Sequence, residues 1–484
     1  MNSADRDSSD FFNPVLIKEL RQSFHNRGIL SLMALLLIGQ LLVLLVVHLV
    51  QVSSKTLPDD LGKAVFIAII TILQVCLFLS CSLGIGQRFM QERLNSELDF
   101  CKLTALSPVR IIWGKLCSAL VLLLFIHSLC LPFLVIAYFL RGIAILQMLK
   151  VVLLLLPLNL VLVFSGVLCG AVGKKNSISL LIVAIFFLAP PATAMIFEMA
   201  RLWNQGFGME EWLAVLVVPV FWCGLCFVLS VSIISHTMAN RMLPIRIYLL
   251  ATLLLFPAAV AGLAALTDQH VLDFLNISFS IITALVSMLI ALLAVCERSR
   301  PSLHILNQCP RNILLRGGFF LLSSGSGGGI LLAALLLLSL LCRPLVLSSS
   351  NTDWYEPLWY FTNTAIYMLF YAALAVFLHE LMPRISSLFW LTLLLVLLLL
   401  LPSVVSVFIS ATDSYMLEYL TITSPFYSPG RPSVYVDTSL NAMSYCHSLP
   451  LAAAALLLAS PSIFRQWHAL VPKSTAAENQ PSLP

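Results

Sequence analysis

Few residues in this sequence have the types and spacing that enzyme chemistry requires. Cys223 and Cys226 have the spacing of a redox-active cysteine pair, but they lie inside a long apolar run without alternating strands and helices, which favours simple packing. Gly173-Lys174-Lys175 is similar to the end of a phosphate-binding loop. The Walker A pattern, however, requires a Gly where Leu168 stands and a Ser or Thr where Lys175 stands. We therefore expect no ATPase site of this type in the chain.

Candidate metal ligands are equally scarce. His379-Glu380 begins like a zinc-protease motif, but Pro383 occupies the position of the second histidine. The nine histidines show no ligand spacing. A glycine-rich stretch at 323–329 opens an apolar run, which predicts close helix packing or a local helix break there. The sequence predicts no catalytic residue, no metal site and no cofactor bound by this chain.

The composition indicates what elements must be present instead. Of the 484 residues, 60% are hydrophobic and only 10% are charged, which is far outside the range of soluble domains. A helix needs roughly 20 apolar residues to cross a bilayer. The sequence therefore predicts an all-α polytopic membrane protein with about twelve transmembrane helices. The candidate runs lie near 29–50, 64–86, 109–139, 148–171, 178–198, 212–235, 246–266, 274–296, 319–342, 359–382, 386–410 and 447–464.

The distribution of positive residues predicts the orientation of these helices. The N-terminal arm, the even-numbered connections and the C-terminal tail carry 20 of the 27 Lys and Arg residues. Positive residues concentrate on the cytoplasmic side, so both termini are expected to be cytoplasmic. Anionic lipid headgroups account for the net charge of +5 without nucleic acid. Cys342 and Cys446 fall near the outer surface, where they could pair.

A short amphipathic segment precedes the first apolar run. Asn13 can cap a helix and Pro14 suits its first position. At 100° per residue, one stripe of the helix is apolar and the opposite face is basic, which is typical of a helix in the membrane interface. The stripe consists of Leu16, Ile17, Leu20 and Phe24, and the basic face includes Lys18 and Arg21. We expect this elbow helix to lie at the cytoplasmic interface.

A second amphipathic segment, residues 91–106, separates two apolar runs on the predicted cytoplasmic side. Phe100 and Leu103 point away from its apolar stripe and would be exposed unless a partner covers them. The charged residues around this pair form a polar rim, as at a protein interface. They are Glu92, Arg93, Glu97 and Asp99. Ser107 and Pro108 then start the next helix, so movement of a docked partner would be transmitted to a membrane helix.

These segments resemble the permease subunits of bacterial ABC-2-type exporters. In that family the matching stretch reads Glu-Arg-x-x-Gly-Thr-Leu-Glu and then Thr-Pro-Leu-Ser. Here Glu92-Arg93 and Leu98-Asp99 follow the first part, with Ser96-Glu97 in place of Gly-Thr. Thr104, Leu106 and Ser107 follow the second, with Ala105 in place of Pro.

The resemblance extends from the elbow through six spans, to about residue 235. It implies a coupling helix that docks on a separate ATPase subunit. It also implies that this partner binds ATP, that the protein lies in the bacterial cytoplasmic membrane, and that the chain works as a homodimer or with a second permease subunit.

The chain is expected to have four parts. Residues 1–28 form the cytoplasmic arm and elbow helix, 29–235 a six-helix permease domain, 236–464 a second six-helix membrane domain, and 465–484 a cytoplasmic tail. The second membrane domain is either an accessory domain, the preferred interpretation, or a second permease half with its own coupling element at 297–317.

Two other functions stay open from the sequence alone. A lipid-modifying membrane enzyme would need clustered acidic or histidine residues, and Asp413, Glu418 and Asp437 are instead spread through a polar loop. An ion-coupled carrier would need ionisable groups at mid-membrane, where His127 is one of few. An exporter permease, which the sequence favours, needs only a membrane pathway and a mechanical link to ATP.

Overall fold

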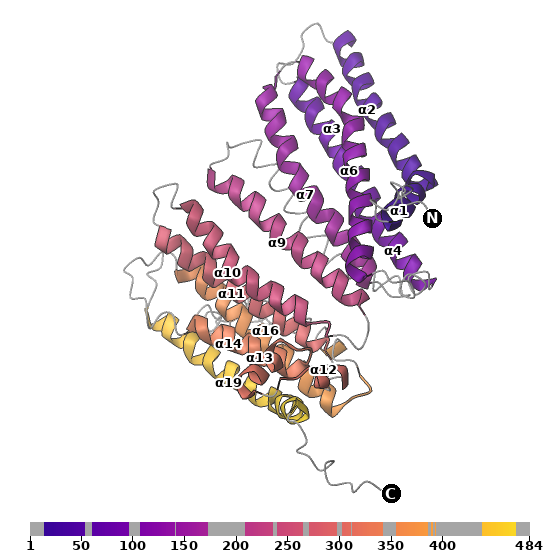
Figure 1. The fold of residues 1–484 in the computed structure, drawn as a ribbon. Helices are drawn as coiled ribbons and strands as arrows, with labels where there is room; N and C mark the ends of the chain where they lie inside the picture. Colours follow the sequence, from indigo (N-terminus) through magenta and orange to yellow (C-terminus); the bar gives the residue numbers. More distant parts are fainter. Residues whose placement is uncertain are drawn as a thin grey trace, which may run out of the picture. The chain divides into compact units, whose positions relative to one another are not determined.

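The computed structural model is all-helical over the residues that it describes (Figure 1). It divides into two compact units, Met1–Ser235 and His236–Pro484. The described residues are 14–53, 61–95, 107–140, 142–172, 209–235, 240–264, 271–297, 303–310, 312–341, 355–385, 389–390, 393 and 438–470.

The first unit contains long apolar helices together with two shorter, more polar ones, α1 and α4. They are α1 (Pro14–His25), α2 (Arg27–Ser53), α3 (Leu61–Leu77), the π-helical segment η2 (Phe78–Gly84), α4 (Ile85–Leu94), α6 (Pro108–Phe139), α7 (Ile145–Val172) and α9 (Met209–Ile234). α3, η2 and α4 follow one another without a break and form a single span of 34 residues. α6 begins as predicted, because the Ser107 hydroxyl accepts a hydrogen bond from the Arg110 amide and Pro108 occupies the first turn.

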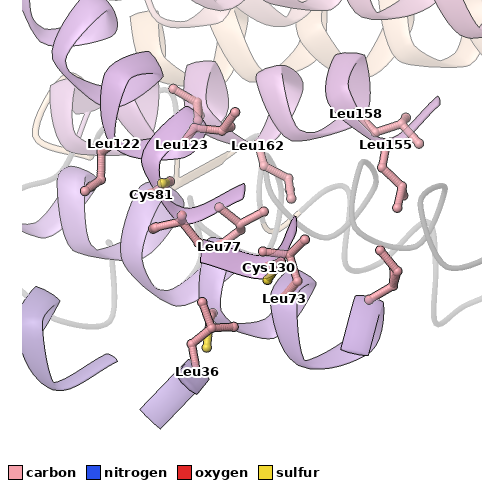
Figure 2. Packing of buried hydrophobic residues seen from close by; sticks show 14 of the residues in the cluster. Leu36, Leu73, Leu77, Cys81, Leu122, Leu123, Cys130, Leu155, Leu158 and Leu162 are labelled. Carbon is pink, nitrogen blue, oxygen red and sulfur yellow. The ribbon is translucent and has the colours of Figure 1, made fainter. Parts of the chain in front are cut away.

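The core of the first unit is a leucine-rich layer between these helices. Figure 2 shows Leu36 of α2, Leu73 and Leu77 of α3, and Leu122 of α6 among the buried residues that contribute to it, with Leu162 of α7 nearby. The helices approach most closely where glycines meet. A methyl group on Gly170 would lie 2.9 Å from the Phe89 side chain, and Ser82 of η2 donates a hydrogen bond to the Leu162 carbonyl at 2.9 Å. Small residues allow this backbone contact, which is a common device in membrane helix pairs.

The second unit contains α10 (Leu243–Ala264), α11 (Val271–Val295), α12 (Leu303–Asn307), α13 (Ile313–Leu322), α14 (Ser326–Leu341), α16 (Tyr355–Leu381) and α19 (Thr438–Leu470). α13 and α14 meet at a bend of 96°. The bend falls in the glycine-rich stretch, so the predicted helix break is confirmed. The predicted close packing is confirmed too, since a methyl group on Gly327 would lie 2.8 Å from the Ile463 backbone in α19.

Five helices in the described part of the chain are long and apolar enough to cross a membrane, or six if the bent pair counts as one span. The chain is therefore a membrane-embedded protein. The expected run at 178–198 and most of the run at 386–410 lie outside the described residues. The total of about twelve transmembrane helices stays a prediction, and so does the interfacial position of the elbow helix.

Candidate functional site

The first unit contains a buried group of charged side chains near the N-terminal end of α6. The Lys115 ammonium donates to Glu19 of α1 and to Glu92 of α4, the latter at 2.5 Å. Only 4% of the Lys115 side chain and 7% of the Glu19 side chain are exposed. The ammonium also lies 4.7 Å from the centre of the Phe89 ring, a favourable cation–π contact. We call these three charged residues, with Arg88, the Lys115 cluster.

Arg88 balances the second negative charge in the Lys115 cluster. Its Nη1 donates to the Ser23 hydroxyl at 2.8 Å, and its guanidinium is attracted to both Glu19 and Glu92. Lys18 contributes less, since it is 44% exposed and lies 3.7 Å from Glu92. Two carboxylates thus face two inner cations, which is the condition under which buried charges are tolerated.

Helix α1 uses its polar face to reach this cluster. Val15, Glu19 and Ser23 are its buried residues, and they recur every four positions along one side. The predicted apolar stripe lies elsewhere: Ile17 and Phe24 are exposed, and Leu16 and Leu20 are half-buried. Lys18 and Arg21 are exposed, as a basic outer face requires.

Two of the residues predicted to contact an ATPase subunit lie at the end of α4 and bond within the chain. Glu92 pairs with Lys115 as described above. The Nη1 of Arg93 donates to the carbonyls of Ala171 and, at 3.3 Å, of Gly170, which are in the last turn of α7. Arg93 therefore joins the end of α4 to the last described turn of α7. Glu92 and Arg93 hold α4 against its neighbours, and their contact with a partner stays a prediction.

The other predicted contact residues, Glu97, Asp99, Phe100 and Leu103, lie outside the described residues. Sequence reasoning missed Glu19, Arg88 and Lys115 as members of one cluster. A signal was present, because Lys115 is a charge within an apolar run and an intramembrane charge is costly without a partner. Nothing in the periodicity showed which acids it would meet.

Other polar groups of the first unit make contacts outside the Lys115 cluster. His127 bonds the Leu123 carbonyl through Nδ1 at 2.9 Å and lies 3.4 Å from the Asn159 amide through Nε2. Cys223 and Cys226 are free thiols, and Cys226 contacts the Ser165 hydroxyl. Within the described ranges no group of three His, Cys, Asp or Glu residues could hold a metal ion.

The second unit has its own buried charge pair, at the break between α13 and α14. Arg246 of α10 is 2% exposed and binds both carboxylate oxygens of Glu297, at 2.6 and 2.8 Å. The same guanidinium donates to the carbonyls of Leu321 at 2.7 Å, Ser323 and Gly325. We call these residues the Arg246 cluster.

The side chains around the helix break form hydrogen bonds with backbone carbonyls and amides that lie between α13 and α14. The Gly325 amide donates to Glu297, and the Ser324 amide donates to Asn240 at 2.9 Å. Burial raises the pKa of the Glu297 carboxyl, and Arg246 and the Gly325 amide oppose this by stabilising its charged form. Backbone groups that are buried away from water require partners of this kind.

Comparisons with known proteins do not identify a family. No family model matches the sequence, and neither curated proteins nor solved structures give a match.

Proposed function

We propose that this protein is the membrane-spanning permease subunit of an ATP-binding cassette exporter of the ABC-2 type. It couples ATP hydrolysis by a separate subunit to the movement of a substrate across the bacterial cytoplasmic membrane. Both termini lie in the cytoplasm, and the chain itself carries out no chemical step. A pathway lined by Leu, Val and Phe suits lipidic or amphipathic cargo.

The observation that supports this function is the anchoring of the connection at 96–106. Glu92 lies just before the connection and Lys115 lies about two turns into α6, after it. The Glu92–Lys115 ion pair therefore joins the two helices between which the connection runs. Glu19 joins α1 to the same ammonium. A force applied to the connection acts on α1, α4 and α6 together.

The Arg93 contact extends this linkage to a fourth helix. Because Arg93 binds the last turn of α7, a shift of α4 also displaces α7. The tight glycine contacts between η2, α4 and α7 resist sliding, so the helices move as a packed group. In the proposed cycle, ATP closes the partner's nucleotide-binding domains, the partner pulls on the connection, and the packed group opens or closes the membrane pathway.

The test is capture of the partner. The tagged chain would be purified in mild detergent from cells that produce it naturally, as wild type and as the Phe100→Asp/Leu103→Asp double variant. The matched control is Ile145→Asp/Leu146→Asp, which adds the same charges at two exposed positions at the start of α7.

We expect an ATPase subunit with a Walker A sequence to purify with wild type and control but not with the Phe100/Leu103 variant. All three proteins should elute as single species from a sizing column. Absence of such a subunit from the wild-type sample would refute the proposed function.

A further inference from the structure

The two units pack their helices in the same order. In the first unit, the span α3–η2–α4 packs against α2, α6 and α7, and α7 packs against both α6 and α9. In the second unit, α11 packs against α10, α14 and α16, and α16 packs against both α14 and α19. These contacts of one unit therefore have counterparts in the other, with α11 in the place of α3–η2–α4 and α16 in the place of α7, whereas the contacts of α1 with α2 and α6 belong to the first unit alone.

Two of the corresponding elements are similar in length, although the span α3–η2–α4 has 34 residues and α11 has 25. α6 covers Pro108–Phe139, and the bent pair α13–α14 covers Ile313–Leu341. α7 has 28 residues and α16 has 27. In each unit a short connection separates the second span from the third, at 95–107 in the first unit and at 296–312 in the second. Shared order, length and packing are what two copies of one fold produce.

Both units also place a glutamate at the start of this connection, with a side chain that is 13% exposed at Glu92 and 2% exposed at Glu297. Glu92 is in the last turn of α4, and Glu297 follows α11 by two residues. Each carboxylate binds a buried cation, Lys115 in one unit and Arg246 in the other. Each also reaches the span that follows its connection, because Lys115 belongs to α6 and the Gly325 amide, which donates to Glu297, lies between α13 and α14.

The shared glutamate–cation pair supports a repeat of the same fold, because buried charges in membrane helices are costly and rare. A glutamate that ties the second span to the third would resist separation of these spans when the connection is loaded. In an accessory domain no docked subunit would pull on that connection, so a glutamate that joins the second span to the third would have no function there.

We infer that the second unit repeats the first, and that its connection at 296–312 docks a second nucleotide-binding subunit. This inference rests on the proposed function, and it replaces the accessory interpretation of residues 236–464. One chain then supplies two docking elements, and a single copy of it binds two ATPase subunits.

The second connection is held in a position suited to docking. Ile305 of α12 is 3% exposed, and the Cys309 thiol lies 3.8 Å from the Leu470 carbonyl of α19, so the inner side of the connection is fixed. Asn307 and Asn312 are exposed on it. Its sequence has three Arg residues and one Glu, whereas the stretch at 91–106 has three acidic and two basic residues. We therefore expect the second subunit to present an acidic docking surface.

Site-specific photo-crosslinking in intact cells tests this inference with the full chain. A photoreactive amino acid would replace Asn95 at the end of α4, Asn307 at the end of α12, or Ile145 at the start of α7. All three residues are exposed, and Ile145 is the control because it follows the α6–α7 connection, on the predicted outer side. Adducts would be identified by mass and searched for a Walker A sequence.

We expect adducts with a nucleotide-binding subunit at both Asn95 and Asn307, and no such adduct at Ile145. The same subunit at both positions, or a different one at each, supports the inference. An adduct at Asn95 together with none at Asn307, or with a chain there that lacks the Walker sequence, overturns the inference but leaves the proposed function standing. Absence of a nucleotide-binding subunit at both positions overturns the two together.

Discussion

Replacement of Lys115 by methionine tests the Lys115 cluster most sharply. Methionine keeps the length and most of the volume of the lysine side chain but removes its charge and its hydrogen bonds. Lys115 is the residue on which Glu19 and Glu92 converge, and its side chain is 4% exposed. In the variant, both carboxylates stay in their buried positions and lose their shortest contact.

The expected cost follows from the burial of the partners. Loss of one member of a buried ion pair typically costs about 3–5 kcal/mol, because the other charge stays desolvated. Arg88 still attracts both carboxylates, so we expect a value near the lower limit, about 3 kcal/mol. The matched control is Lys18→Met, which removes a 44% exposed lysine that lies 3.7 Å from Glu92 and should cost less than about 1 kcal/mol.

The assay is equilibrium unfolding in mixed detergent micelles, followed by circular dichroism. A double variant, Lys115→Met with Glu19→Gln, separates the pairwise interaction from the effect of each change alone. The two changes should be coupled by about 1–3 kcal/mol, with the double variant more stable than the sum of the single changes implies. If Lys115→Met and Lys18→Met lower the unfolding free energy equally, the cluster is not a buried tie and the reasoning fails.

Two other substitutions test the packing and the helix break. Gly166→Ala forces a methyl group into the Ser82 backbone and should destabilise the protein by about 1–3 kcal/mol, whereas Gly317→Ala, with no atom within 4 Å, should be neutral or stabilising by up to about 1 kcal/mol. Equal melting temperatures for these two variants would contradict the close helix contact. Arg246→Lys should cost about 2 kcal/mol or more, because the single nitrogen of an ammonium cannot bind Glu297 as Nη2 does and also reach the Leu321 and Ser323 carbonyls that Nη1 binds. Arg465→Lys is its control, because the Arg465 side chain is 48% exposed in its ion pair with Glu380. Similar unfolding free energies for the two variants would refute a specific role for the Arg246 guanidinium.

Several features of the fold could be predicted from the sequence because they depend on local chemistry. Helical structure follows from long apolar runs that must satisfy their own backbone groups in lipid. The start of α6 follows from the cap at Ser107 and the proline after it, and the break at Ser323–Gly325 follows from a glycine-rich stretch.

The charge clusters could not be predicted, because they depend on which helices become neighbours. Glu19 and Lys115 are 96 positions apart. Periodicity identified the apolar stripe of α1 but could not show that Val15, Glu19 and Ser23 would be its buried residues. In a bilayer the lipid accepts the apolar side of a helix, so polar side chains turn toward partners inside the protein. The π-helical turn at Phe78–Gly84 left no sequence signal that we recognise.

The most direct test of the proposed function is the ATP hydrolysis of the purified complex. The wild-type chain and the Phe100→Asp/Leu103→Asp variant would be purified from their native membranes and assayed for phosphate release from ATP. The sequence has no Walker A motif of its own, so any hydrolysis should come from the partner. We predict activity in the wild-type preparation, with its loss from the variant. A wild-type preparation that contains neither a nucleotide-binding subunit nor ATPase activity would contradict the account.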